Sequence, residues 1–264
     1  MILFDSHSHL DDKSYDTDRD DVILRAAQAQ VKEIMVVGID LDSSRKAVEI
    51  AQKYPNIITS VGYHPHYAKN CSKDTIHALI GLARTQSCVK AWGETGLDFN
   101  RMFSPRMDQE TCLIRQLEAA GDLDLPLIFH ERDTGGRFYE LVKAHGPRTR
   151  KGVVHCFSGT KQEMVKYLDL GYHIGITGIL TIKKRGAYLR SIVPMIPDDR
   201  LLIETDCPYL TPAPQKNKVR RNEPGFVKSV LLKLAEVRQT DPEQLSEIIY
   251  KNTKRFYGID RPDC

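Results

Sequence analysis

Residues 1–10 read MILFDSHSHL, in which a short apolar run, Ile2–Phe4, leads into two histidines, His7 and His9. Alternate side chains of an extended strand lie on one face, with Cα atoms about 7 Å apart, so both imidazoles point the same way. Further apolar runs follow along the chain, each succeeded by a segment with helical periodicity. They are Ile34–Ile39, Ile57–Val61, Val89–Trp92, Leu127–Phe129, Gly152–Val154, Tyr172–Ile176 and Leu201–Ile203. Strands that alternate with helices in this way predict an α/β fold.

Two α/β architectures fit this alternation, an open doubly wound sheet and a closed barrel. Residues of metal-ligand type follow the first, fourth, fifth, sixth and eighth apolar runs, and closure of the sheet would bring those strand ends to a common mouth. The length of 264 residues also suits one (β/α)8 barrel, which typically needs about 250. We therefore predict a single-domain (β/α)8 TIM barrel over residues 1–264, covered by two further helices after the eighth strand.

Composition and charge limit the classes of protein to which the chain can belong. Hydrophobic residues make up 41% of the chain and charged residues 28%, values typical of a globular domain. The net charge of +3 is too small to indicate nucleic-acid binding by itself. The N-terminal segment lacks the features of a secretory signal, no apolar run has the length of a membrane span, and six cysteines are scattered without close pairs. We expect reduced thiols in a cytoplasmic protein, with no membrane association and no obligate protein partner.

The residues that end the apolar runs predict a metal centre. A buried imidazole or carboxylate is costly unless it is paired or bound to metal, and five strands ending in this way by chance is improbable. An H-x-H pair alone would not be sufficient, because it fits two polar residues at a strand end about equally well. The predicted ligands are His7, His9, Glu94, His130, His155 and Asp206.

The expected chemistry is hydrolysis assisted by two divalent ions. His7, His9 and Asp206 would bind one ion, and His130 and His155 the other. A carboxylate has two oxygens, so Glu94 could bridge both ions. Two ions about 3.5–4 Å apart can activate a shared water for in-line displacement at phosphorus. Asp206 is then the candidate to orient that water and accept its proton.

Several neighbouring residues allow two interpretations each. Asp5 and Glu204 precede His7 and Asp206 by two positions, so they would either hydrogen-bond to the ligands or form ion pairs in the barrel core. His64 and His66, in the stretch after the third strand, would contact substrate or pack the loop. Histidines 77, 145 and 173 are expected to be structural or on the surface.

Basic residues cluster in loops that would surround the mouth. Such a rim suits a polyanion, and aromatic residues after the fourth strand, Phe99 and Phe103, offer faces on which bases could stack. A solvated surface is the alternative. The basic residues are Arg132, Lys183, Lys184, Arg185, Lys216, Lys218, Arg220 and Arg221.

Six motifs in order give a more specific indication: FDSHSHL at 4–10, VGYHPH at 61–66, GETGLDF at 93–99, HCFSG at 155–159, IETDCPYL at 203–210 and RRNEP at 220–224. Together they resemble the TatD family of deoxyribonucleases over essentially the whole chain. The likeness implies a TIM-barrel nuclease that uses divalent cations, usually Mg²⁺, to remove nucleotides from the 3′ ends of single-stranded DNA. Its metal ligands fall on the six residues predicted above, whereas Cys207 stands where a smaller residue is common.

By the same likeness, His64, Arg132 and Arg221 would contact substrate phosphate. The predicted cofactor is two divalent ions, with Mg²⁺ favoured by carboxylates and phosphate substrates, and Mn²⁺ or Zn²⁺ by the histidines. Two rival functions use the same barrel: a small-molecule metallohydrolase, such as an amidase, lactonase or deaminase, and a nucleic-acid binding module without catalysis. Glu94 in place of a lysine carbamate, and the basic rim, favour the nuclease.

Overall fold

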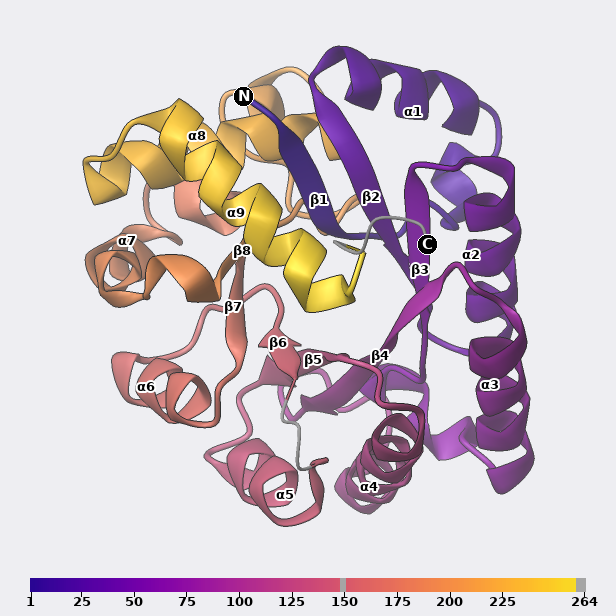
Figure 1. The fold of residues 1–264 in the computed structure, drawn as a ribbon. Coiled ribbons are helices and arrows are strands. Elements are labelled where there is room, and N and C mark those ends of the chain that lie inside the picture. The colour runs from indigo at the N-terminus through magenta and orange to yellow at the C-terminus, as the bar shows by residue number, and fades with distance from the viewer. Residues whose placement is uncertain (148–150, 260–264) are drawn as a thin grey trace. The chain divides into compact units, whose positions relative to one another are not determined.

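A computed structural model describes residues 1–147 and 151–259 of the chain (Figure 1). The chain forms two compact units. The first comprises residues 1–36, 156–158 and 174 onward, and the second comprises residues 37–155 and 159–173.

The strands of the first unit place the two ends of the sheet side by side. Parallel pairing joins β1 (Leu3–Ser8) to β2 (Val31–Val37), and β7 (His173–Ile176) to β8 (Leu201–Ile203). A further parallel bridge links Ser8 to Cys207, just beyond the end of β8. The first and last strands are therefore neighbours, as closure of a barrel requires.

The helices of the first unit end with a pair that packs on these strands. α9 contacts β1, β8 and α8, and the Tyr257 hydroxyl donates to the Ser6 carbonyl at 2.8 Å (Figure 1). Asp241 caps α9 by accepting from Gln244 N, and Gly258 ends it in a left-handed conformation. The helices are α1 (Arg19–Gln28), α7 (Ala187–Ile192), α8 (Val227–Arg238) and α9 (Pro242–Tyr257), with short 3-10 turns η1 (Lys13–Tyr15), η3 (Gly178–Thr181), η4 (Val193–Met195), η5 (Asp198–Arg200), η6 (Gln215–Asn217) and η7 (Pro224–Phe226).

The second unit holds the other four strands and their helices. β3 (Ile57–Val61) pairs with β4 (Val89–Asp98), β4 with β5 (Leu127–Arg132), and β5 with β6 (Gly152–Val154), all in parallel. The buried Trp92 indole donates to Gln116 Oε1 at 3.2 Å, which joins this sheet to α4. The helices are α2 (Leu41–Lys53), α3 (Lys73–Thr85), α4 (Arg106–Leu123), α5 (Arg137–His145) and α6 (Lys161–Asp169), with the 3-10 turn η2 (Pro65–Asn70).

One eight-stranded sheet runs in chain order from β1 to β8. With β1 also beside β8, the predicted (β/α)8 TIM barrel is confirmed. The prediction of a single domain over residues 1–264 stays a prediction.

The strand ends differ from the prediction. β4 and β5 are longer than the runs Val89–Trp92 and Leu127–Phe129, so Glu94 and His130 lie inside strands rather than after them. Pairing continues from Thr95 to Asp98 of β4. The apolar run of this strand ends at Trp92. The strand continues because backbone hydrogen bonds between strands do not depend on apolar side chains.

Gly96 allows this close pairing, and replacing it should lower the stability of the protein. Its φ is +150°, and an added Cβ would lie 1.8 Å from the His130 carbonyl oxygen. We expect Gly96→Ala to lower the free energy of unfolding by at least about 3 kcal/mol, measured by urea denaturation. Gly81→Ala is the matched control: its Cβ would meet nothing within 4 Å inside α3, so it should raise stability by about 0.5–1 kcal/mol. Equal stability of the two variants would contradict this account.

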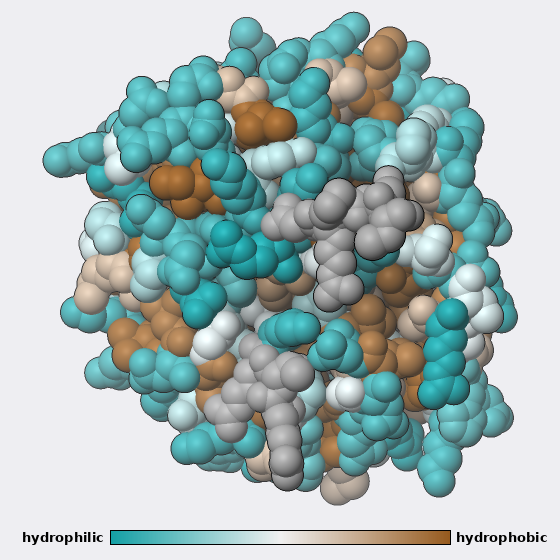
Figure 2. Space-filling view, in the orientation of Figure 1, coloured by the Kyte–Doolittle hydropathy of each residue, from teal (hydrophilic) through white to brown (hydrophobic). Residues whose placement is uncertain are grey.

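The surface carries mixed side chains. Figure 2 shows a face that is mostly hydrophilic, with smaller hydrophobic areas between the polar ones. Within residues 1–147 and 151–259, no helix combines the length and hydrophobicity needed to cross a bilayer. The five cysteines there are not in disulfides: Cys71, Cys88, Cys112, Cys156 and Cys207. Cys264 lies outside the described residues.

Candidate metal centre

The first unit brings together three of the predicted ligands, His7, His9 and Asp206. His7 lies in β1, His9 directly follows it, and Asp206 follows β8. The Nε2 atoms of the two histidines are 3.3 Å apart. Asp206 Oδ1 lies 3.7 Å from Nε2 of His7 and 3.4 Å from Nε2 of His9. Three donor atoms suited to divalent metals thus converge at the ends of neighbouring strands.

Backbone hydrogen bonds between these strand ends hold this first cluster. Asp206 N donates to the His7 carbonyl at 2.9 Å, and His9 N donates to the Cys207 carbonyl at 2.8 Å. Asp206 has φ +55°, a left-handed conformation that Asp adopts more readily than most residues. Tyr209 N then donates to the Asp206 carbonyl at 2.9 Å and closes a turn. The aspartate is therefore held by its backbone on both sides.

The second unit gathers a second cluster around Glu94. One oxygen, Glu94 Oε1, lies 2.8 Å from His130 Nδ1, 2.9 Å from His155 Nε2 and 3.2 Å from His64 Nε2. The Glu94 residue is only 2% exposed. Donor atoms of Glu94, His130 and His155 all lie within 4.8 Å of one another, so the group could hold a metal ion. His64, predicted to contact substrate, is placed here as a fourth potential donor.

The electrostatics of this second cluster favour a cation. Burial alone would raise the pKa of Glu94, but charge interactions with His155 and His64 and hydrogen bonding to His130 hold that pKa well below its usual range. Burial lowers the pKa of His64 to about 3, so this imidazole is neutral at pH 7. Burial also opposes protonation of His130, but hydrogen bonds with Asp98 and Glu94 outweigh it and raise the pKa of His130. A metal ion would compete with protons for the lone pairs of the histidine nitrogens that face Glu94.

Asp98 is a residue of the site that the sequence argument missed. Its buried Oδ2 lies 2.8 Å from His66 Nε2 and 3.2 Å from His130 Nε2. Burial would raise the pKa of Asp98, but the hydrogen bonds with His130 and His66 lower it, so it remains a carboxylate. A carboxylate on the far nitrogen of a metal-binding histidine orients the ring and increases its basicity. The available signal was spacing, because Asp98 follows Glu94 by four residues in one strand and faces the same side.

Asp5 and Glu204 support the loops that carry ligands. Asp5 accepts from Thr205 N at 2.8 Å and from its hydroxyl at 2.6 Å, next to Asp206. Burial raises the pKa of Asp5 well above its usual range, although the bonds from Thr205 oppose this. Glu204 Oε1 accepts from Cys156 N. These bonds reach the neighbours of ligands, and a Glu204 oxygen also lies within 4.8 Å of a ring nitrogen of His7. Hydrogen bonding of Asp5 or Glu204 to the ligands themselves stays a prediction.

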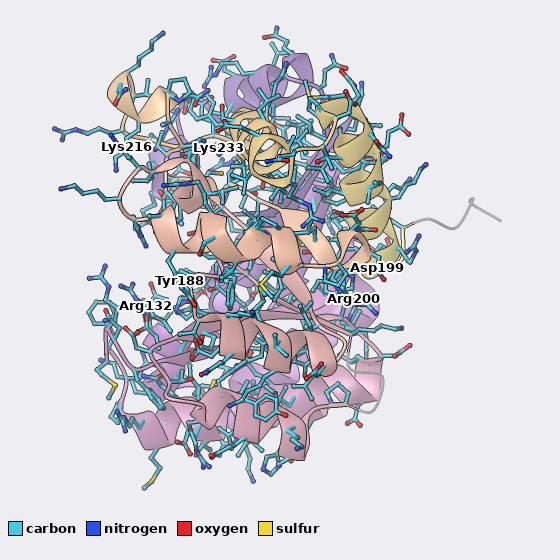
Figure 3. The ribbon with its side chains drawn as sticks, turned by 90° about the vertical axis from the view of Figure 1, so that its left-hand side faces the viewer. Arg132, Tyr188, Asp199, Arg200, Lys216 and Lys233 are labelled. Carbon is cyan, nitrogen blue, oxygen red and sulfur yellow. The ribbon has the colours of Figure 1, made fainter. Side chains whose placement is uncertain are left out.

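The predicted phosphate contacts Arg132 and Arg221 have different surroundings. Arg132 ends β5 and is half-buried; Figure 3 shows its side chain at the edge of the second unit. Arg221 in the first unit pairs with Asp18, with Nη2 2.5 Å from Oδ2, and lies over the Tyr15 ring at 4.6 Å. The charge of Arg221 is thus already matched by a carboxylate. Its contact with phosphate stays a prediction.

The predicted stacking residues also have partners within the second unit. The Arg106 guanidinium lies 4.4 Å from the centre of the Phe99 ring. Phe103 is 56% exposed and meets the His66 ring edge-on, with centroids 4.8 Å apart. Phe103 therefore keeps a free area beside the histidines, whereas one side of Phe99 is covered.

Comparison with known proteins gives a consistent result over the whole chain. The family model described as TatD related DNase matches residues 4–258. A protein named 3′-5′ ssDNA/RNA exonuclease TatD from Citrobacter koseri is 39% identical over 97% of this chain and 99% of its own length. The protein of the same name from Escherichia coli K12 is 38% identical, with the same coverage.

Solved structures agree with these matches. The crystal structure of YJJV, a TatD homologue from Escherichia coli K12, superposes with a TM-score of 0.90 at 29% identity and covers 97% of this chain and 98% of its own. A TatD family hydrolase from Entamoeba histolytica gives a TM-score of 0.88 at 28% identity, with the same coverage.

Proposed function

The chain belongs to the family of TatD-related DNases, and from that premise we propose that it is a divalent-metal-dependent 3′-5′ exonuclease acting on single-stranded DNA. The observation that carries the proposal is the convergence of three imidazole nitrogens on one buried oxygen of Glu94, within 3.2 Å. A nuclease that works with metal ions needs such a preorganised set of nitrogen and oxygen donors.

The donor sets fit divalent cations. The first cluster offers two imidazoles and one carboxylate, and the second offers a carboxylate with up to three imidazoles. We propose that each cluster would hold one ion; the bridging role of Glu94 stays a prediction from the sequence. When bound, such ions polarise phosphate and water oxygens and offset the charge that develops at phosphorus.

The remaining steps fall to the side chains of this chain. Asp206 would orient the attacking water and accept its proton, since its side chain is 13% exposed while Oδ1 faces the histidines. Asp98 would hold His130 in the orientation that presents Nδ1 to Glu94. His64, Arg132 and Arg221 would contact the phosphates of the strand.

Mg²⁺ is the ion we propose for catalysis, with Mn²⁺ and Zn²⁺ as alternatives that the histidines would accept. A cytoplasmic location is also a proposal, supported by the reduced thiols of Cys71, Cys88, Cys112 and Cys207.

A nuclease assay with two labels tests the function. The metal-free protein is incubated with single-stranded DNA labelled at the 5′ or the 3′ end, with Mg²⁺, Mn²⁺, Zn²⁺ or EDTA. We expect the 3′ label to leave first as a mononucleotide, the 5′-labelled strand to shorten stepwise, and no cleavage in EDTA. A parallel assay with RNA measures the preference between DNA and RNA. An intact label with every ion, together with hydrolysis of lactone or amide substrates, would indicate a small-molecule metallohydrolase. Binding without shortening would indicate a binding module.

A further inference from the structure

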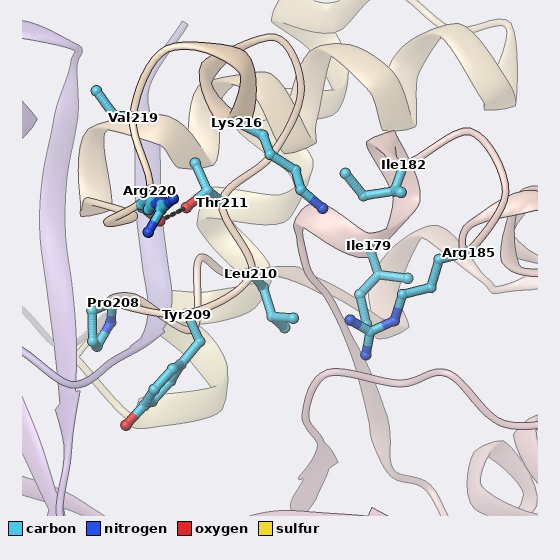
Figure 4. Close-up of a pocket in the computed structure, with 10 residues that line it drawn as sticks. All are labelled: Ile179, Ile182, Arg185, Pro208, Tyr209, Leu210, Thr211, Lys216, Val219 and Arg220. Carbon is cyan, nitrogen blue, oxygen red and sulfur yellow. Dashed lines mark hydrogen bonds between the residues drawn. The ribbon is translucent and has the colours of Figure 1, made fainter.

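A cavity opens in the first unit beside the segment that carries Asp206 (Figure 4). Its volume is about 620 Å³, and ligand pockets typically have about 300–1,000 Å³. One wall is the loop after β8, and the other is η3 with the residues that follow it. The described lining residues are Ile179, Ile182, Arg185, Pro208, Tyr209, Leu210, Thr211, Lys216, Val219 and Arg220.

The cavity is positively charged. Arg185, Lys216 and Arg220 line it, and none of the ten described lining residues is a carboxylate. Figure 4 shows the side chains of Lys216 and Arg185 reaching from opposite walls toward the space between them, and Figure 3 shows Lys216 at the surface. Within residues 1–147 and 151–259 these three cations form no ion pair, whereas the next residue, Arg221, is paired with Asp18. Their charge is available to an external anion.

Most of the remaining lining is apolar, and one lining residue lies next to the first cluster. Ile179, Leu210 and Val219 give the cavity an aliphatic surface, and Val219 is 43% exposed. Tyr209 is 55% exposed, and its ring centre lies 6.1 Å from that of His9. One lining residue of the cavity, Tyr209, is thus a neighbour of His9. An aliphatic surface with cations around it matches a nucleotide, which has a flat base and an anionic phosphate.

Hydrogen bonds hold both walls in place. Ala213 N donates to Thr181 Oγ1 at 2.8 Å and joins the loop after β8 to η3. Thr211 Oγ1 donates to the Arg220 carbonyl at 2.7 Å, which closes the loop on itself (Figure 4). Arg190 Nη1 donates to the carbonyls of Leu180 and Ile182 at 2.8 and 3.1 Å. A cavity built in this way loses little conformational entropy when a ligand enters.

We propose that this cavity binds a nucleotide of the retained part of a single strand, next to the nucleotide being released. Its phosphate contacts Arg185, Lys216 and Arg220, and its base lies against Ile179, Leu210 and Val219. The inference rests on the proposed function and specifies where the strand beyond the scissile bond is bound. Long strands then bind more tightly than a single nucleotide because they fill this second position.

Binding and hydrolysis are measured separately to test it. The double variant Arg185→Gln, Lys216→Gln removes two charges, and Lys73→Gln, at the exposed start of α3, is the control for loss of a charge elsewhere. Binding of a fluorescent 12-nucleotide single strand is followed by anisotropy in EDTA over a range of salt concentrations. Hydrolysis of thymidine 5′-(p-nitrophenyl phosphate), which has one nucleotide, is followed with Mg²⁺.

We expect the double variant to bind the 12-mer at least tenfold more weakly and to reduce the salt slope by up to about 0.7, because both cations contact the same phosphate. Hydrolysis of the mononucleotide ester and the behaviour of Lys73→Gln should be unchanged. Val219→Glu should weaken 12-mer binding further than Val219→Gln, because the two side chains differ in charge and hardly in size.

Unchanged 12-mer affinity in the double variant, no 12-mer binding by the unaltered protein, or an equal loss on the mononucleotide ester would overturn the inference. A protein that binds the strand through these residues but hydrolyses neither substrate would contradict the proposed function alone.

Discussion

Replacing Glu94 by glutamine should reduce turnover on single-stranded DNA by about 100- to 4,000-fold and remove bound metal. The change keeps the shape of the side chain but removes its charge. The oxygen that faces His130, His155 and His64 within 3.2 Å becomes part of a neutral amide. Breaking a buried charged contact costs about 3–5 kcal/mol, and each 1.4 kcal/mol of a barrier is tenfold in rate. Metal content by plasma mass spectrometry and kcat with Mg²⁺ measure the effect.

A neighbouring carboxylate provides the control for this variant. Glu131 lies beside His130 in the sequence, is half-buried, and accepts from the Thr134 hydroxyl at 2.6 Å. Glu131→Gln removes the same charge from the neighbouring strand β5 but leaves the cluster intact, so its metal content and turnover should stay within about threefold of the unaltered protein. A Glu94→Gln protein that is folded, retains all its metal and turns over at a normal rate would show that this cluster is not the catalytic centre.

The closed sheet could be predicted from the sequence because its signals were local. Each strand contains a short apolar run, and Ile57–Val61, Gly152–Val154 and Leu201–Ile203 have the bounds that the structure shows. Polar residues of metal-ligand type at five strand ends distinguished the barrel from an open sheet, since only closure makes β1 and β8 neighbours. The β-bridge between Ser8 and Cys207 is the contact that closure of the sheet requires.

The missed parts of the site depend on contacts between distant segments. Asp98 lies beyond the apolar run of its strand, and nothing local shows that the His66 and His130 rings meet its carboxylate. The pairing of Arg221 with Asp18 joins residues 203 positions apart. Propensity and periodicity describe a segment and its faces, so they cannot say which side chain of another segment lies opposite. A resemblance supplies ligand positions but not the partners of each rim cation.

Replacing Asp206 by asparagine should lower turnover by about 10²–10⁴-fold, the range that a lost general base accounts for. Asp206 Oδ1 faces the histidines of the first cluster at 3.4 and 3.7 Å. The amide keeps an oxygen for those contacts, so metal content is measured first and only metal-loaded protein is compared. An amide cannot accept the proton of the attacking water, so hydroxide ion must replace it.

The pH dependence separates the two roles of Asp206. If the carboxylate is the base, the rate of the metal-loaded asparagine variant should rise by about tenfold per pH unit between about pH 7 and 9, as the hydroxide concentration does. The rate of the unaltered protein should rise less with pH, because its Asp206 carboxylate already supplies the base. A variant whose rate is low at every pH to the same degree would make Asp206 a metal ligand only. A variant with near-normal turnover would remove it from both roles, because neither ligation by a charged oxygen nor proton transfer would then depend on that carboxylate.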